Sequence, residues 1–354
     1  MIVADSPLIL GIETSCDETA AAVVAGCRRV LSSIVASQHD LHAEYAGVVP
    51  EIASRAHLER IVPVIRAALA EAGLALGDLQ AVAVGHRPGL IGSLLVGVSA
   101  AKALAWSLGV PIIGVDHVLA HLHSCALDDE AIEYPALGLV VSGGHTSLFL
   151  VDGPLDVQLL GRTIDDAAGE AYDKAATILE LGYPGGPALD QLAQRGDERA
   201  FDFPMASLGG DELNFSFSGL KTALLYAVCG QPVGRGAAAH FERDASMLDA
   251  ARKADLAASF QRAAVGALLR NVSRALDRHD VSCLLVGGGV SANTRLRADL
   301  AELSRRRKIR VRLPRPEYCL DNAAMIAALA AAHVAAGRFD DWSLGADSVS
   351  MILS

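Results

Sequence analysis

Apolar runs and polar turns alternate along the first part of the chain. Residues 8–12 are apolar, and after a polar turn two further runs of small or β-branched apolar residues cover residues 19–25 and 30–36. Runs of this length, bounded by turn residues, predict consecutive antiparallel strands. Apolar positions at helical spacing then predict a helix over about residues 51–72, directly after Pro50.

Strands and helices alternate in the region that follows. The pattern predicts a strand over residues 81–84, a helix over 92–108, a strand over 112–115 and a further helix from about His117. This alternation is typical of the βαβ units of an α/β fold.

The opening pattern returns in the second half of the chain. Apolar runs predict strands over residues 137–141, 147–151 and 157–160, and the strand, glycine turn and helix near residue 84 have a counterpart near residue 287. Such internal similarity predicts a duplicated α/β fold with two related lobes that face a cleft.

The duplication also sets the expected domain boundaries. We expect the first lobe to cover residues 1–135 and the second to cover residues 136–354, which agrees with the chain length of about two domains. A mostly helical stretch at about 161–255 has no counterpart in the first half. Insertions of this kind commonly shape substrate access.

Composition narrows the class of protein. Of the 354 residues 52% are hydrophobic and 20% charged, which is too apolar for a disordered chain. No apolar stretch runs for about 20 residues without charged or turn residues, so we expect no membrane span. The first residues lack the basic region of a signal peptide and read as a core strand.

Cysteine spacing and charge bear on the surroundings of the protein. Six cysteines occur without a C-x-x-C pair, which favours neither a disulfide framework nor a thiolate zinc site, and the cytoplasm is the simplest expectation. The net charge of −11 means that any nucleic-acid binding must use a local patch. The basic run over residues 305–315 is one candidate, and a solvated helix end is the equally plain alternative.

Glycine-bearing turns are the first candidate for chemistry. The segments G-I-E-T-S-C-D-E-T (11–19) and S-G-G-H-T (142–146) each join two predicted strands, and G-G-G-V-S-A-N (287–293) opens a helix. Glycines let backbone N–H groups approach a phosphate, and facing hairpins would form a nucleotide clamp. Ordinary strand connections explain any one turn alone. Neither a P-loop nor a Rossmann glycine motif is present.

Two histidines are the second candidate. His117 and His121 are four residues apart, so a helix places both rings on one face, where they can share a metal ion. Asp321 is a candidate third ligand, although an aspartate before an apolar helix also serves as an N-cap. Two imidazoles and one carboxylate would suit Fe or Zn as a Lewis acid.

Acidic residues are the third candidate, over residues 165–174 and 183–190. Carboxylates there could bind ribose hydroxyls, but acidic residues at a helix start usually complement the helix dipole. By itself this stretch is interpreted as structural.

Together these segments resemble the family of tRNA N6-adenosine threonylcarbamoyltransferases, which are duplicated, actin-like proteins. The resemblance extends from about residue 8 to residue 337, and its densest pieces are G-I-E-T-S-C-D-E-T, G-V-V-P-E-I-A-S-R-A-H, H-V-L-A-H, V-V-S-G-G-H-T, I-D-D-A-A-G-E-A-Y-D-K, Y-P-G-G-P, F-S-F-S-G-L-K-T, G-G-G-V-S-A-N and D-N-A-A-M-I-A. It implies an actin-like fold with a central nucleotide cleft.

The resemblance also implies an activity and partners. The enzyme would move a threonylcarbamoyl group from threonylcarbamoyl-AMP to the N6 amine of the adenosine 3′ of the anticodon, position 37, in tRNAs that read codons beginning with A. Bacterial relatives work with a paralogous actin-like subunit and a small P-loop ATPase in the cytoplasm. One divalent metal ion, Fe²⁺ or Zn²⁺, would be bound in each subunit.

Family positions can be carried onto this chain residue by residue. The metal ligands fall on His117, His121 and Asp321, and the acidic residues near the reacting centre fall on Asp17 and Glu18. The positions that contact the acyl-adenylate fall on Val140, Val141, Ser142, Gly143, Gly144, Asp173, Gly186, Asp190 and Asn293.

The chain departs from the family pattern at three places. Asp116 stands where relatives often have histidine, His86 and Arg87 stand where they usually have glycine before Pro-Gly-Leu, and the C-terminal tail lacks their basic ending. Alternative functions are a carbamoyltransferase for small hydroxylated substrates, a sugar-kinase-like ATPase and a silent scaffold. A metalloprotease is disfavoured, because the histidine pair lacks the glutamate of H-E-x-x-H.

Overall fold

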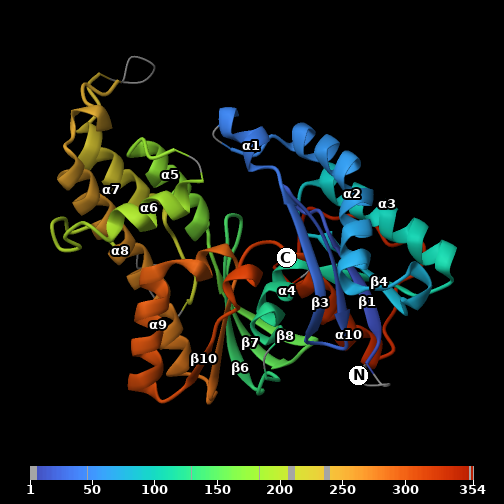
Figure 1. Cartoon of the computed structure of the whole chain (residues 1–354). Coiled ribbons are helices and arrows are strands. Elements are labelled where there is room, and N and C mark those ends of the chain that lie inside the picture. The colour runs from blue at the N-terminus through green and yellow to red at the C-terminus, as the bar shows by residue number, and fades with distance from the viewer. Residues whose placement is uncertain are drawn as a thin grey trace.

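The computed structural model describes residues 6–350, 352 and 353, apart from residues 46, 129, 183, 206–211 and 235–239. Two lobes, each built on a five-stranded sheet, make up the molecule (Figure 1). Every strand and helix that the hydrophobic pattern predicted is present, with its ends shifted by a few residues.

The two sheets have the same topology. The first contains β1 (Leu8–Glu13), β2 (Glu18–Ala25), β3 (Arg29–Ser37), β4 (Ala81–Arg87) and β5 (Ile112–Asp116) in the order β3-β2-β1-β4-β5. The second contains β6 (Ala136–Val141), β7 (Thr146–Gly153), β8 (Asp156–Arg162), β9 (Cys283–Gly287) and β10 (Arg310–Arg312) in the order β10-β9-β6-β7-β8. In each sheet the first strand pairs antiparallel with the second and parallel with the fourth. The predicted duplication is therefore confirmed.

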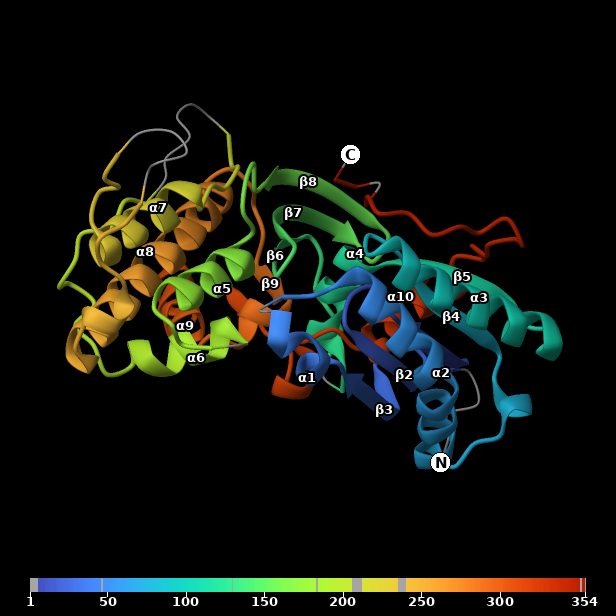
Figure 2. The same ribbon diagram turned by 90° about the horizontal axis from the view of Figure 1, so that it is seen from above.

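Helices cover the sheets and fill the insertion. The first half contributes α1 (His39–His42), α2 (Pro50–Ala72), α3 (Ile91–Leu108) and α4 (His117–His123). The second half contributes α5 (Ala168–Ile178), α6 (Gly185–Ala193), α7 (Ser218–Cys229), α8 (Ala250–Leu276), α9 (Thr294–Arg307) and α10 (Ala323–Ala335). Helices α5 to α9 gather beside the second sheet, away from α2 and α3 (Figure 2).

Helix α10 is the main exception to a simple division of the chain. It lies in the expected second-lobe sequence, yet it packs on β1, β2 and β4 of the first sheet and against α4. A helix that is apolar around its circumference must be buried on all sides, and nine of the 13 residues of α10 are buried. The chain thus crosses back to the first lobe before its end.

Helix α3 is long and apolar enough, by length and composition alone, to cross a membrane. In this fold it packs on β4 and beside α2, with Leu94, Val98 and Ala101 buried. A helix that covers a sheet in an α/β lobe needs this apolar face.

Gly11 shows how closely α10 approaches the first sheet. A Cβ atom added to Gly11 would lie 2.2 Å from the carbonyl oxygen of Ala323 and 3.0 Å from the Cβ of Ala327. No side chain fits there, because a well-packed interior has no spare volume.

We therefore expect Gly11→Ala to lower the free energy of unfolding by about 1–3 kcal/mol, the usual cost of overpacking a core. Urea unfolding of the purified variant measures this change. Gly77→Ala is the matched control, since a Cβ at Gly77 meets nothing within 4 Å. Equal stability of the two variants would contradict the proposed tight contact.

Candidate active site

A cavity of about 660 Å³ lies in the cleft between the lobes. From the first half of the chain, the turns after β1 and β4 and the start of α4 line it. From the second half, the lining comes from the turn after β6, from α5 and α6, from the segments before α9 and α10, and from the C-terminal tail. Residues far apart in the sequence therefore share one chamber, as the predicted cleft requires.

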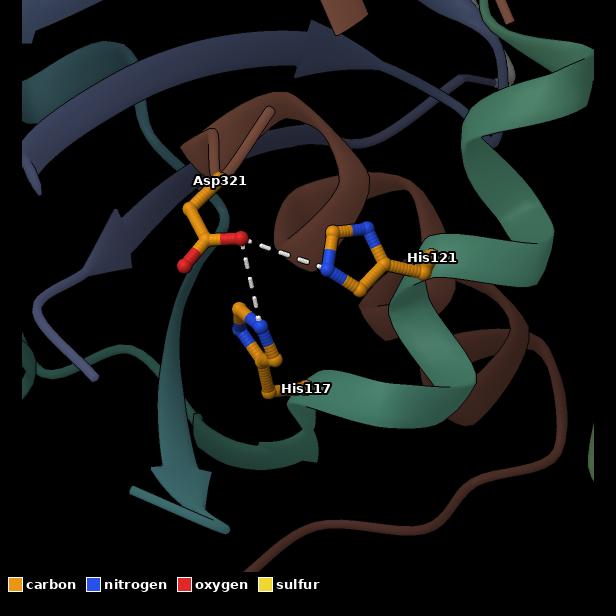
Figure 3. Close-up of side chains that lie close together, drawn as sticks. All are labelled: His117, His121 and Asp321. Carbon is orange, nitrogen blue, oxygen red and sulfur yellow. Dashed lines mark ion pairs between the residues drawn. The ribbon is translucent and has the colours of Figure 1, made fainter. Parts of the chain in front are cut away.

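His117, His121 and Asp321 point toward one another (Figure 3), and His117 and Asp321 line the cavity. The carboxylate Oδ1 of Asp321 lies 3.4 Å from Nε2 of His117 and 3.3 Å from Nε2 of His121. The packing of α10 against α4 accounts for this meeting of residues about 200 positions apart. The structure places all three predicted metal ligands side by side.

The capping role considered for Asp321 belongs to its neighbour. The Asn322 side chain accepts a hydrogen bond from the backbone N–H of Met325 at 2.9 Å and caps α10. Asp321 is left to face the two imidazoles. At the other helix, Asp116 caps α4 by accepting from the N–H of Val118 at 3.1 Å.

The donor set fits a divalent metal ion. Both ring nitrogens of His121 are buried and make no hydrogen bond to any residue that the structure describes, although Nε2 points toward Asp321. Buried polar atoms normally have a partner, so an unpaired imidazole nitrogen beside a carboxylate marks a ligand position. Two imidazoles and one carboxylate suit Zn²⁺ or Fe²⁺ and leave coordination positions open.

Charge within the triad is consistent with that fit. Burial alone would lower the pKa of His117, but the Asp321 and Glu13 carboxylates outweigh it and hold that pKa well above its usual value. Burial lowers the pKa of His121, which keeps this imidazole neutral and able to donate its lone pair. A bound cation would take the place of the proton that His117 otherwise holds between two carboxylates.

Glu13 orients His117 and was not found from the sequence. This carboxylate is fully buried at the end of β1, and its Oε2 lies 3.1 Å from Nδ1 of His117. Its Oε1 accepts the N–H of Ser15 at 2.5 Å. A histidine ligand commonly gives its second N–H to such a carboxylate, which fixes the ring and the tautomer. The only signal in the sequence is a charged residue at the end of an otherwise apolar strand.

The glycine turn after β6 forms another wall. Ser142, Gly143 and Gly144 line the cavity, and a Cβ added at either glycine would meet nothing within 4 Å. The backbone there faces open space in which a ligand can lie. The side chains of Val140 and Val141, by contrast, are fully buried in the core and do not line the cavity.

Two of the remaining predicted contacts, Asp190 and Asn293, belong to one polar network with Gln261 and Thr294. Asp190 accepts from Gln261 Nε2 at 3.0 Å and from the Thr294 hydroxyl at 2.8 Å, and Asn293 donates to Gln261 Oε1 at 2.9 Å. Asp173 accepts from the N–H of Gly186 at 3.1 Å, and burial raises its pKa. These hydrogen bonds fix the side chains of Asp173, Asp190 and Asn293. All three residues, and Gly186, line the cavity.

Asp17 and Glu18 also line the cavity, beside His39 of α1. Nε2 of His39 lies 3.4 Å from Glu18 Oε1 and 3.9 Å from Asp17 Oδ2. Burial raises the pKa of Glu18 to about 8, against the opposing effect of His39. A carboxyl group with this pKa can exchange a proton near neutral pH.

Two charged segments of the sequence are mainly structural. Asp165 accepts hydrogen bonds from Ser216, Ser218 and the N–H of Phe217, which ties the segment before α5 to the start of α7. In the basic run Arg307 pairs with Asp277 and Arg310 with Glu130 and Glu133. This pairing favours the interpretation of the basic run as a solvated helix end over a role in phosphate binding.

Further residues line the cavity without having been predicted as site residues. Among them are Ser15, Cys16, His39, Pro88, Gly89, Leu90, His145, Tyr172, Cys319, Leu320 and Ser348. Burial lowers the pKa of His145 to about 4, so this ring is neutral. Ser15, Cys16, His145 and Tyr172 lie inside motifs quoted above, whereas His39 and Ser348 carry no local signal.

Comparison with known proteins identifies the family. A family model described as tRNA N6-adenosine threonylcarbamoyltransferase matches residues 29–328. A protein of that name from Trichlorobacter lovleyi is 51% identical over 340 residues, which is 96% of this chain and 95% of the relative. The chain belongs to this family. It is accordingly an enzyme of the acyltransferase class.

Solved structures agree on the fold. HypF from T. kodakarensis aligns with a TM-score of 0.60 and 14% identity over 94% of this chain and 48% of its own. Component A of the Acidaminococcus fermentans (R)-2-hydroxyglutaryl-CoA dehydratase aligns with a TM-score of 0.51 and 14% identity over 93% and 99%. The predicted actin-like, two-lobed α/β fold is therefore confirmed for this family member.

The contact of Glu13 with His117 predicts a change in metal affinity. We expect Glu13→Gln to weaken Zn²⁺ or Fe²⁺ binding about 10- to 100-fold, the usual effect of losing a carboxylate behind a histidine ligand. Competition with a chromophoric chelator measures this affinity.

Two reference variants make the result specific. His121→Ala should lose most of the metal, and Glu59→Gln on the exposed face of α2 should bind metal like the unaltered chain. Unchanged affinity in Glu13→Gln would show that Glu13 has only a packing role.

Proposed function

We propose that the chain transfers a threonylcarbamoyl group from threonylcarbamoyl-AMP to the N6 amine of adenosine 37 in tRNAs that read codons beginning with A. One observation carries the proposal: members of the histidine–aspartate triad and of the polar network around Asp190 line the same cavity. In a member of this family, such a cavity can hold an acyl group at one end and a nucleotide at the other.

The carbamoyl-phosphate anhydride is already an activated acyl donor. The enzyme therefore has mainly to position the two substrates and to stabilise the negative charge that develops during the transfer. The adenosine amine attacks the carbonyl carbon of the carbamoyl-phosphate anhydride, the bond from this carbon to the phosphate oxygen breaks, and AMP leaves. A divalent metal ion, held by His117, His121 and Asp321, would supply Lewis acidity. Gly143 and Gly144 line the cavity, and their N–H groups would bind the negative charge of the phosphate.

Glu18 is the proposed acceptor of the amine proton. It lines the cavity, and its raised pKa places its titration near neutral pH, where a general base is most effective. Asp17 adds a second carboxylate to the same wall and takes part in holding the cationic form of His39. Their joint role near the reacting centre remains the one that the resemblance implies.

The proposal includes partners and location. We propose that the chain acts in the cytoplasm on tRNA, together with a paralogous actin-like subunit and a small P-loop ATPase. The basis is membership of the family and the resemblance to its bacterial members. Size-exclusion chromatography of the mixed subunits tests the assembly.

The decisive experiment is reconstitution. The metal-loaded chain and its partner subunits are incubated with threonylcarbamoyl-AMP and unmodified tRNA, and nucleosides are examined by mass spectrometry. We expect threonylcarbamoyladenosine in tRNAs that read codons beginning with A, and at least a 100-fold loss with His121→Ala, since a Lewis acid supplies several kcal/mol. Carbamoylation of small hydroxylated compounds without any tRNA modification would overturn the proposal.

The protonation of Glu18 predicts a pH dependence. Below a pH of about 8 the carboxyl group is largely protonated and cannot accept the amine proton. The single-turnover rate, corrected for spontaneous decay of the acyl-adenylate, should therefore rise with pH through about 8. Glu18→Gln should be roughly 100- to 10,000-fold slower and lack this rise. A rise that persists in Glu18→Gln would assign the proton to another group.

A further inference from the structure

The last residues of the described chain run along the first lobe beside α3 and β5 toward β8 (Figure 2), and one of them, Ser348, lines the cavity. The tail leaves α10, and the N–H of Asp340 donates to the carbonyl of Ile112 at 3.0 Å, beside the edge strand β5. Lys102 donates to the carbonyl of Trp342 at 2.8 Å, and Leu344 is buried in the first-lobe core. This segment is therefore built into the fold.

Two anchors then hold the tail at the cavity. His86 at the end of β4 pairs its Nδ1 with the carbonyl of Gly345 at 3.0 Å, and its own carbonyl accepts the N–H of Asp347 at 3.0 Å. Beyond the cavity, the buried hydroxyl of Ser350 donates to Asp116 Oδ2 at 2.6 Å. Between these anchors Ser348 lines the cavity.

The second anchor is joined directly to the metal-binding helix. Asp116 uses Oδ1 to cap α4, which begins with His117, and uses Oδ2 to hold the tail. Arg87 lies near the same oxygen, with Nε 3.5 Å away, and partly balances its charge. A carboxylate that accepts buried hydrogen bonds on both oxygens couples the two segments it joins.

The three places at which the chain departs from the family pattern are thus one structural unit. His86 and Arg87, Asp116 and the tail were separate departures in the sequence, and here they contact one another. Ser350 binds the residue that precedes His117, and Ser348 lines the cavity two residues earlier, so the tail lies on the side of the cavity where α4 begins. Asp173, Asp190 and Asn293, which also line the cavity, belong to the second lobe.

We propose that residues 345–350 form a fixed wall of the cavity beside the metal end, and that Ser350 is a positioning residue that holds this wall against Asp116 so that it contacts the acyl group of the substrate. The proposal rests on the proposed function for the identity of that acyl group. It adds a determinant of acyl recognition that lies outside the metal and nucleotide motifs.

Equilibrium binding without tRNA tests this wall. Calorimetry compares threonylcarbamoyl-AMP with AMP, and the ratio of their dissociation constants reports contacts to the acyl group alone. We expect Ser350→Ala to reduce the advantage of the acyl-adenylate about five- to tenfold, the usual effect of losing one hydrogen bond, while AMP binding stays unchanged. Ser350→Thr keeps the hydroxyl and should restore the ratio.

A second variant keeps the test decisive if Ser350→Ala does not fold. Ser348→Phe adds bulk directly to the wall and should reduce the same ratio at least fivefold. Glu59→Gln on the exposed face of α2 touches neither the tail nor the cavity lining and should leave both dissociation constants as they are.

Two results would overturn the proposal. An unchanged ratio in Ser348→Phe would show that the tail does not touch the acyl group, and an equal loss of AMP and acyl-adenylate binding would show only general destabilisation. Failure of the proposed function appears separately, as absence of tRNA modification by the unaltered chain. The binding ratio can be measured in either case.

Discussion

Burial of helix α10 is the constraint on which the rest of the structure depends. Its apolar surface has to leave water, and the first sheet and α4 together supply the surface that covers it. The chain must then approach α4 just before α10 begins, and this approach brings Asp321 beside two imidazoles. Hydrophobic packing between helices and a sheet thereby determines the geometry of the candidate metal site.

Two different side-chain environments contribute to the cavity, a charged cluster and a polar hydrogen-bond network. In one, charged groups lie close together, so that Glu13, His117 and Asp321 stabilise one another. In the other, Asp190, Gln261 and Asn293 satisfy each other through neutral and charged hydrogen bonds. A cation suits the first environment, and a hydroxyl-bearing nucleotide suits the second.

The sequence predicted the elements well and the cleft in outline, because period and turn chemistry are local properties. The histidine pair could be placed on one helix face from its spacing alone, and Asp321 could be proposed because it precedes an apolar helix. Glu13 and His39 could not be identified as site residues from the sequence, since their roles depend on contacts between distant segments that no local pattern encodes. The resemblance pointed to Val140 and Val141 as well, but their side chains belong to the core.

The crossing of α10 and the path of the tail could not be predicted for a related reason. Each depends on which surface is left uncovered after the other elements have packed. Asp116 illustrates the point: in the sequence it is a single unusual residue before His117, and in the structure it joins a helix start, an arginine and the chain end. Only the assembled fold shows that these departures belong together.

The position of α4 has one further consequence. A Cβ added to Gly287, at the end of β9, would lie 2.1 Å from the carbonyl oxygen of His121, so the second sheet presses directly on the turn of α4 that carries this histidine. On its other side the same helix rests on α10. Helix α4 is therefore packed between the two lobes. A rotation of one lobe relative to the other would move the imidazoles of His117 and His121.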